Sequence, residues 1–300
     1  MKKSLKSRFN ILGVLMIALM VIVVGCGTAT TPTTPAPQTA ETPKPARPEL
    51  ILATTTSTQD SGLLDTLIPA FEKKTGYKVK TVAVGTGAAL AMGEKGDADV
   101  LLVHAPASEK KLVDNKTAIN YQLVMHNDFI IVGPSADPAK VKETKTAPDA
   151  LKAINASPSI FVSRGDDSGT DKMEKALWKT AAITPTPAKY QSTGQGMGQT
   201  LTIASEKEAY TLTDRATYLA SKKNLKLDIL LQGGISLLNI YHVMQVNPEK
   251  FPKVNTDGAK AFVDFMVNAD TQKLIGSFGK DKYGQALFFA DAGKKMEDLK

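Results

Sequence analysis

The sequence contains a single cysteine, Cys26, and only three histidines among its 300 residues. A lone cysteine excludes an intramolecular disulfide, so the hydrophobic core has to stabilise the fold. His104, His126 and His242 lie far apart in the chain and lack the spacing of a zinc site. No Gly-x-Ser-x-Gly segment marks a hydrolase nucleophile. We therefore expect a protein without metal, cofactor or catalytic activity.

The chain also has only a small excess of positive over negative charge. The chain has 37 Lys and Arg against 30 Asp and Glu, which gives a formal net charge of +7. Four of the positive charges lie in the first ten residues, which leaves +3 for the rest. Because there is also no basic run and no aromatic platform, we expect no nucleic-acid partner.

The N-terminus has a distinctive pattern. The basic segment MKKSLKSRFN is followed by an uncharged, apolar run from Ile11 to Gly25. This is the pattern of a secretory signal peptide, which we predict over residues 1–25. The alternative is a permanent anchor helix, but the run is shorter than the roughly 20 apolar residues that span a membrane.

Cys26 follows Val23-Val24-Gly25 directly, as the lipidated cysteine of a bacterial lipobox does. We therefore expect Cys26 to carry acyl chains that anchor the mature protein to the outer side of the cell membrane, at about 0.8 kcal/mol for each buried methylene. Residues 26–49 are rich in Pro and Thr and have almost no large apolar residues. This composition predicts an extended tether.

Strand and helix patterns alternate from Leu50 onward. Leu63, Leu64, Leu67, Ile68 and Phe71 recur at helical spacing, and Gly76 is a suitable helix end. The order strand, helix, strand, helix, strand over ELILATTT, SGLLDTLIPAFEKKTG, YKVKTVAVG, GTGAALAMGEKG and ADVLLVHAP predicts a parallel sheet with helices on its faces.

Two apolar segments, Met125–Val132 and Leu237–Gln245, are long enough to cross from one lobe to another and back. We expect an α/β fold with a discontinuous lobe I over residues 50–127 and 245–300. Residues 128–244 would form lobe II, with a ligand cleft between the lobes. A single doubly wound sheet is the alternative, because periodicity does not separate the two.

Hydroxyl and glycine residues gather where four predicted strands end. These segments are TTTST (54–58), GTG (85–87), SRGDDSGT (163–170) and STGQGMG (192–198). Ligands bind beyond the carboxyl ends of such strands, where helix N-termini present free N–H groups. An N-cap or a turn explains each segment alone, but four together with Arg164 favour an oxyanion site.

Arg164 brings a permanent charge and a forked set of donors; a surface ion pair with Asp166 or Asp167 is the alternative. The ligand-binding residues that we predict are Thr55, Thr56, Ser57, Thr58, Thr86, Arg164, Ser168, Gly169 and Thr170, with His104, Thr193 and Gly196 in a second tier.

Five segments, ATTTSTQDSGLLD, DVLLVHAP, SRGDDSGT, GQGMGQTL and AYTLTDR, together resemble the tungstate-binding lipoproteins of bacterial ABC uptake systems. The resemblance implies a periplasmic-binding-protein type II fold, in which two α/β lobes are joined by two crossing strands. It also implies a monomer that captures tungstate outside the cell and delivers it to an ABC transporter permease.

Phosphate-binding relatives of this family share Arg-x-x-x-Ser-Gly-Thr, which Arg164, Ser168, Gly169 and Thr170 match. They carry a serine where Thr86 stands. They also carry an aspartate before Ala-Pro that accepts the proton of hydrogen phosphate, where this chain has His104. A neutral histidine can donate to a fully deprotonated dianion, although His104 as a buried structural residue is the alternative. Molybdate, phosphate or sulfate binding, an anion-ester hydrolase and a lipid-anchored sensor remain as other functions.

Overall fold

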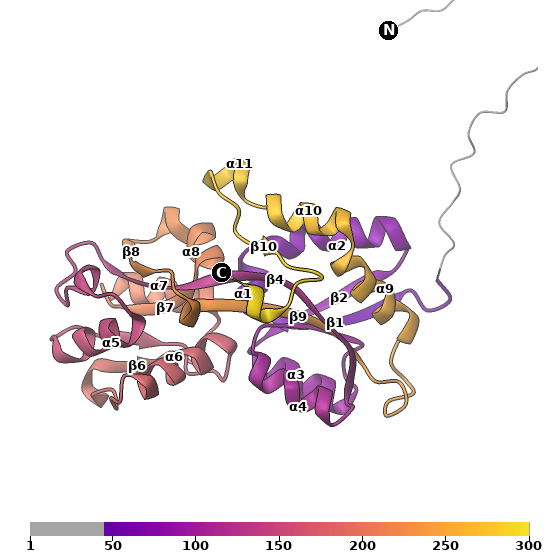
Figure 1. The fold of residues 1–300 in the computed structure, drawn as a ribbon, viewed down its shortest axis with the longest axis horizontal. Helices are drawn as coiled ribbons and strands as arrows, with labels where there is room; N and C mark the ends of the chain where they lie inside the picture. The colour runs from indigo at the N-terminus through magenta and orange to yellow at the C-terminus, as the bar shows by residue number, and fades with distance from the viewer. Residues whose placement is uncertain (1–44, 300) are drawn as a thin grey trace, which may run out of the picture. The chain divides into compact units, whose positions relative to one another are not determined.

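The computed structural model describes residues 45–299 (Figure 1). The predicted signal peptide, Cys26 and most of the predicted tether lie outside the described residues. The last residues of that tether belong to the folded part, because the first strand begins at Glu49 and Arg47 donates hydrogen bonds to the carbonyls of Lys253 and Val254. Within residues 45–299, no helix combines the length and apolarity that crossing a membrane demands.

The described chain alternates strands and helices, as the sequence pattern predicts. The strands are β1 (Glu49–Thr55), β2 (Lys78–Val84), β3 (Val100–Val103), β4 (Ala118–Pro134), β5 (Phe161–Ser163), β6 (Tyr190–Ser192), β7 (Thr211–Asp214), β8 (Leu227–Gln232), β9 (Leu238–Val246) and β10 (Phe289–Ala290). The α-helices are α1 (Thr56–Asp60), α2 (Leu63–Thr75), α3 (Thr86–Lys95), α4 (Pro106–Asp114), α5 (Ala147–Ala156), α6 (Gly169–Thr180), α7 (Met197–Glu206), α8 (Arg215–Ser221), α9 (Thr256–Val267), α10 (Ala269–Ser277) and α11 (Lys280–Tyr283). Short 3-10 helices are η1 (Val141–Glu143), η2 (Pro187–Lys189), η3 (Lys222–Asn224), η4 (Ile235–Leu237) and η5 (Met296–Asp298).

The main sheet has the strand order β10-β4-β9-β3-β1-β2, and β7 and β8 also pair with β4. β1 runs parallel to β2 and β3, as predicted. β9 runs antiparallel to both β3 and β4, so the expectation of a parallel sheet holds only for the first three strands. The reason is that β4 leads the chain away from these strands and β9 returns it, so the two must run in opposite directions.

β4 connects two parts of the molecule. Residues 118–128 of this strand pair with β9, and residues 129–134 pair with β7 and β8. We call β1–β3 with α1–α4, α9 and α10 the first half, and β5–β8 with α5–α8 the second half. Figure 1 shows β4 and β9 side by side between the two halves.

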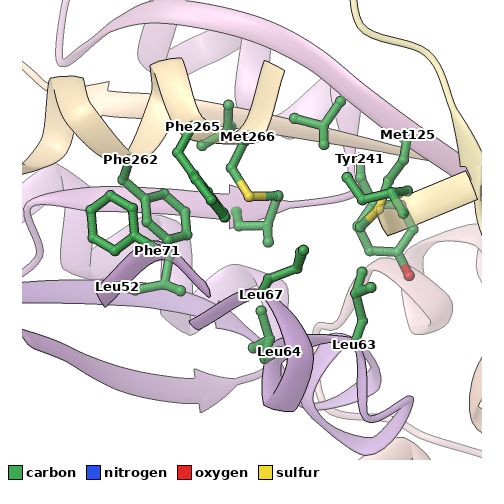
Figure 2. Packing of buried hydrophobic residues seen from close by; sticks show 14 of the residues in the cluster. Leu52, Leu63, Leu64, Leu67, Phe71, Met125, Tyr241, Phe262, Phe265 and Met266 are labelled. Atoms are coloured by element: carbon green, nitrogen blue, oxygen red, sulfur yellow. The ribbon is translucent and has the colours of Figure 1, made fainter. Parts of the chain in front are cut away.

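Each half is built around buried apolar clusters, and Ala216 of α8 in the second half joins the cluster that α2 and α9 form in the first. In the first half, the predicted apolar face of α2 packs on α9 and β1, and Phe71 meets Phe262 edge to face at 5.1 Å between ring centroids (Figure 2). In the second half, Phe161 and Trp178 pack edge to face at 5.4 Å. α2 ends at Gly76, as expected, with the left-handed backbone (φ 77°) that glycine favours.

Candidate functional site

The hydroxyl run at 54–58 straddles the end of β1 and the start of α1. Thr54 Oγ1 donates to the carbonyl of Leu102 at 2.7 Å, which holds the strand. Thr55 caps α1, since its Oγ1 accepts the N–H of Thr58 at 3.3 Å. The pattern predicted a helix from Ser61 only; α1 is an additional turn, which the cap on Thr55 stabilises.

Thr55, Ser57 and Thr58 form a buried hydroxyl cluster. Thr55 Oγ1 lies 2.7 Å from Thr58 Oγ1 and 3.2 Å from Ser57 Oγ. His104, which follows β3, places its Nε2 atom 3.0 Å from Thr55 Oγ1 and 3.1 Å from Ser57 Oγ. Burial lowers the pKa of His104 to about 4, so the ring is neutral at physiological pH.

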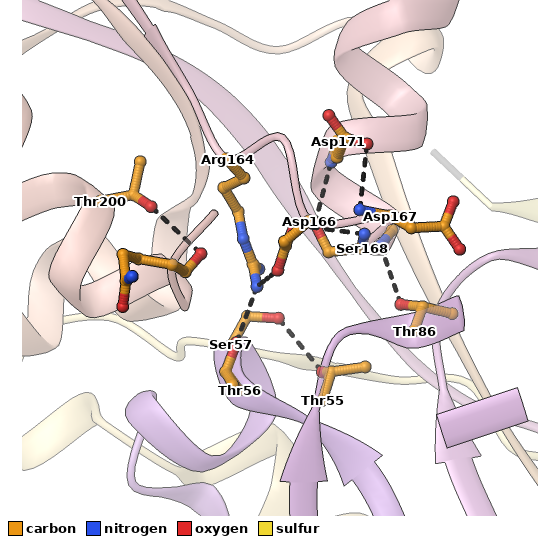
Figure 3. A network of polar contacts seen from close by, with 12 residues as sticks. Thr55, Thr56, Ser57, Thr86, Arg164, Asp166, Asp167, Ser168, Asp171 and Thr200 are labelled. Atoms are coloured by element: carbon orange, nitrogen blue, oxygen red, sulfur yellow. Dashed lines mark hydrogen bonds and ion pairs between the residues drawn. The ribbon is translucent and has the colours of Figure 1, made fainter. Parts of the chain in front are cut away.

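Arg164 lies in the loop between β5 and α6, and only 1% of its surface is exposed. Its Nη2 donates to Thr56 Oγ1 of the first half at 2.8 Å and pairs with Asp166 Oδ2 at 2.5 Å (Figure 3). The interaction with Asp166 is therefore a buried ion pair, not the surface pair considered from the sequence. The Nε and Nη1 atoms of Arg164 are buried and have no partner among the described residues.

The Ser-Gly-Thr segment begins α6. Ser168 caps the helix, with its Oγ accepting the N–H of Asp171 at 3.1 Å. The N–H of Gly169 donates to Thr86 Oγ1 at 2.8 Å, which joins the second half to the first. The hydroxyl of Thr170 is buried and, within residues 45–299, without a hydrogen-bond partner.

Glycines let the backbones of the two halves meet. A Cβ on Gly85 would lie 2.8 Å from the carbonyl oxygen of Asp166, and one on Gly169 would lie 2.8 Å from His104 Nδ1. The N–H of Gly198 donates across the same seam to Asp60 Oδ2 at 2.9 Å. Gly196, in the second tier, faces Thr56. Side chains larger than hydrogen at these points would keep the halves apart.

The structure therefore brings residues of all four segments, together with His104, to one seam between the halves. Thr193 stands slightly apart, because its hydroxyl contacts Thr200 at 3.0 Å and the carbonyl of Arg164 at 3.3 Å. Sequence reasoning missed Asn127 and Asn239, which are buried beside His104. The available signal was an amide residue in each of two strands, Asn127 between His126 and Asp128, and Asn239 between Leu238 and Ile240.

Glu174 of α6 is a buried carboxyl group next to this site. It accepts hydrogen bonds from the Tyr190 hydroxyl at 2.6 Å and from Trp178 Nε1 at 3.0 Å. Burial outweighs these bonds and raises the pKa of Glu174 from its ordinary value of 4.5 to about 7. The ionised carboxylate is thus less stable in the folded than in the unfolded chain.

The substitution Glu174→Gln is expected to change the pH dependence of stability. Because the pKa of Glu174 is higher in the folded than in the unfolded chain, the folded chain binds the Glu174 proton more tightly. The stability that this proton contributes is fully present below pH 4.5 and is lost as pH rises through about 7. Glutamine does not ionise and so does not suffer this loss. The free energy of unfolding of the variant should therefore exceed that of the unaltered chain by roughly 3 kcal/mol at pH 8, but by little at pH 4.5. Urea unfolding of both chains at the two pH values measures this; an equal difference at both would contradict it.

Comparisons with known proteins point to one group. Residues 30–270 match the model of the PBP superfamily domain. The tungstate-binding protein TupA of Peptoclostridium acidaminophilum is 47% identical over 286 residues, which are 95% of this chain and 98% of that protein. The tungstate ABC transporter structure from Geobacter sulfurreducens is 49% identical, with a TM-score of 0.71 over 77% of this chain and 98% of that one. The tungstate-binding protein TupA from Desulfovibrio alaskensis G20 is also 49% identical, with a TM-score of 0.69 over 82% and 99% of the two chains.

Proposed function

Because this chain belongs to the PBP superfamily and, within it, to the tungstate-binding proteins of ABC transporters, we propose that it captures tungstate between its two halves and delivers it to an ABC permease. It acts as a binding protein and not as an enzyme. The ligand is a tetrahedral dianion whose four oxygens only accept hydrogen bonds, so the site has to supply donors.

Arg164 is the observation that carries this proposal. A guanidinium that is 99% buried, with Nε and Nη1 unpartnered in the described chain, is costly unless an acceptor meets it. An oxygen of a bound dianion is such an acceptor. The buried Thr170 hydroxyl, from the helix that follows the same loop, supplies another donor.

Hydroxyls of the first half complete the proposed donor set. Thr56 Oγ1 accepts a bond from Arg164, and Thr86 Oγ1 accepts one from the N–H of Gly169. Each hydroxyl therefore keeps its own proton for a ligand oxygen. The N-terminus of α6 adds a partial positive charge. The full set of proposed contacts is Thr55, Thr56, Ser57, Thr58, Thr86, Arg164, Ser168, Gly169 and Thr170.

The proposed lobes are residues 50–127 with 245–300 and residues 128–244, with the anion enclosed as they close. Separate apolar clusters and the pairing of β4 with both β9 and β7–β8 support this division. We further propose that the protein works as a monomer outside the cytoplasmic membrane, anchored through a lipid on Cys26. The anchor rests on the sequence pattern alone, whereas the relatives' role in ABC transport supports the permease partner.

Isothermal titration of the chain without its signal peptide and anchor cysteine, residues 27–300, with tungstate, molybdate, sulfate and phosphate in turn tests the proposal. We expect binding heat with tungstate and none with sulfate or phosphate. The ratio of molybdate to tungstate affinity decides between these two anions, whose charge and size nearly match. Absence of heat with all four anions would overturn the proposed function.

A further inference from the structure

A continuous chain of buried side chains runs from the second half, through the two crossing strands, to the hydroxyl cluster. Each member is at most 3% exposed. In order, the chain consists of Asp214 at the end of β7, Asn127 on β4, Asn239 on β9, His104 after β3, and then Thr55 and Ser57. Asn127 and Asn239 lie directly opposite each other in the β4–β9 pairing.

Asp214 fixes the direction of the hydrogen bonds at one end. Its Oδ1 atom accepts the N–H of Thr217 at 2.8 Å and faces Asn127 Nδ2 at 3.4 Å. Burial raises the pKa of Asp214 to about 6, so this group is an ionised carboxylate at neutral pH. A carboxylate only accepts, so Asn127 turns its amino group to Asp214 and its oxygen to Asn239. That oxygen accepts from Asn239 Nδ2 at 2.8 Å.

The orientation of the Asn239 side chain determines which nitrogen of His104 carries the proton. The Nδ2 atom of Asn239 is committed to Asn127 Oδ1 and to the Tyr241 hydroxyl, at 2.8 and 3.0 Å. The remaining Oδ1 atom lies 2.7 Å from His104 Nδ1 and can only accept. Nδ1 therefore carries the proton, and in a neutral ring the lone pair is on Nε2. This lone pair faces the hydroxyls of Thr55 and Ser57.

The surroundings of His104 keep the ring in this neutral form. The imidazole is 3% exposed, stacks beside Tyr241 at 4.6 Å between centroids, and has the edge of Gly169 against Nδ1. Burial is the main cause that lowers its pKa to about 4, and the positive charge of Arg164 acts in the same direction. The hydrogen bond to Asn239 acts in the opposite direction and raises the pKa. Its acceptor is a neutral amide oxygen and not a carboxylate.

We propose that His104 is a positioning residue: it does not contact the anion but accepts a hydrogen bond from Thr55 or Ser57, which orients the cluster and leaves the other of these two hydroxyls to donate to the ligand. Both ring nitrogens have protein partners, so the direct contact that the sequence suggested for His104 is replaced by an indirect role. The orienting role rests on the proposed function, whereas the protonation of the ring does not.

Nitrogen-15 NMR of the same chain, residues 27–300, tests the protonation state without ligand. The two ring nitrogens of His104, assigned with the His104→Gln variant, should show the neutral form protonated on Nδ1, unchanged between pH 7 and 8, where Asp214 is ionised. A proton on Nε2, or a charged ring in this range, would overturn the inference. This result is independent of whether tungstate binds.

Two substitutions test the orienting role. In His104→Gln, the side-chain carbonyl can take the place of Nε2 as an acceptor, whereas His104→Leu offers none. We expect tungstate affinity to fall about tenfold in the leucine variant, the effect of leaving one buried hydroxyl without its acceptor, and to stay within about threefold of the unaltered chain in the glutamine variant.

The thermal midpoint of each variant and the ligand-induced shift of that midpoint are measured alongside. Unchanged affinity in His104→Leu would overturn the orienting role, and so would an equal loss in both variants. Failure of the unaltered chain to bind tungstate would count against the proposed function instead, with the NMR result unaffected.

Discussion

Replacing Arg164 by alanine is expected to weaken tungstate binding by a factor of hundreds to thousands, the largest effect of any single substitution at the site. Arg164 is the one arginine of the proposed donor set, and its Nε and Nη1 atoms are buried without a hydrogen-bond partner among residues 45–299. Removing one partner of a buried charge pair costs about 3–5 kcal/mol, which corresponds to that range of affinity. Calorimetric titration with tungstate measures the loss directly.

Two further variants make the Arg164 experiment specific. Arg164→Lys keeps the charge but lacks the forked donors, so its affinity should lie between those of the alanine variant and the unaltered chain. Arg47→Ala removes the same charge at a distance from the site, where Arg47 donates to the carbonyls of Lys253 and Val254. It should leave binding unchanged. If Arg164→Ala binds tungstate as the unaltered chain does, the position of the site is wrong.

The second large effect is expected from Gly85→Ala. Gly85 has an ordinary extended backbone (φ −62°, ψ 150°), so alanine fits it without strain. Its Cβ, however, would lie 2.8 Å from the backbone oxygen of Asp166 in the other half. A backbone atom cannot move aside cheaply, so the halves would no longer close fully on the anion. We expect affinity to fall at least about tenfold, a loss of roughly 1.4 kcal/mol or more.

Small-angle X-ray scattering separates this effect from unfolding. The unaltered chain should contract when tungstate is added, and Gly85→Ala should contract less while keeping a cooperative thermal transition. Gly276→Ala is the matched control. It is the same substitution inside α10, where a Cβ would meet Ala290 at an ordinary 3.7 Å, and it should bind normally. Full contraction and full affinity in Gly85→Ala would show that this contact does not limit closure.

Local patterns in the sequence predicted much of this fold. The spacing of apolar residues in α2 and the glycine after it specify a helix, its buried face and its end, because these depend on neighbours three or four residues away. The antiparallel return of β9 was not predictable in this way. It depends on which strand lies beside β3, and a distant part of the chain decides that.

In the candidate site, too, local patterns were predictable and long-range pairings were not. Hydroxyls, glycines and an arginine at strand ends point to anion binding one segment at a time, and the structure places these segments at one seam. Asn127 and Asn239 carried no comparable signal, since a single amide within a strand can serve many purposes. Their role depends on the β4–β9 register, which sets them opposite each other beside His104.

The position of β9 in the sheet also constrains the order in which the protein can fold. β9 lies between β4 and β3, so the first half lacks an interior strand until residue 246 has been synthesised. The second half is continuous in sequence and can form earlier. Contacts between β3 and β9 span more than 130 residues, and such long-range pairing is slow. β3, the strand that leads to His104, therefore lacks β9, its final neighbour, until most of the chain has emerged.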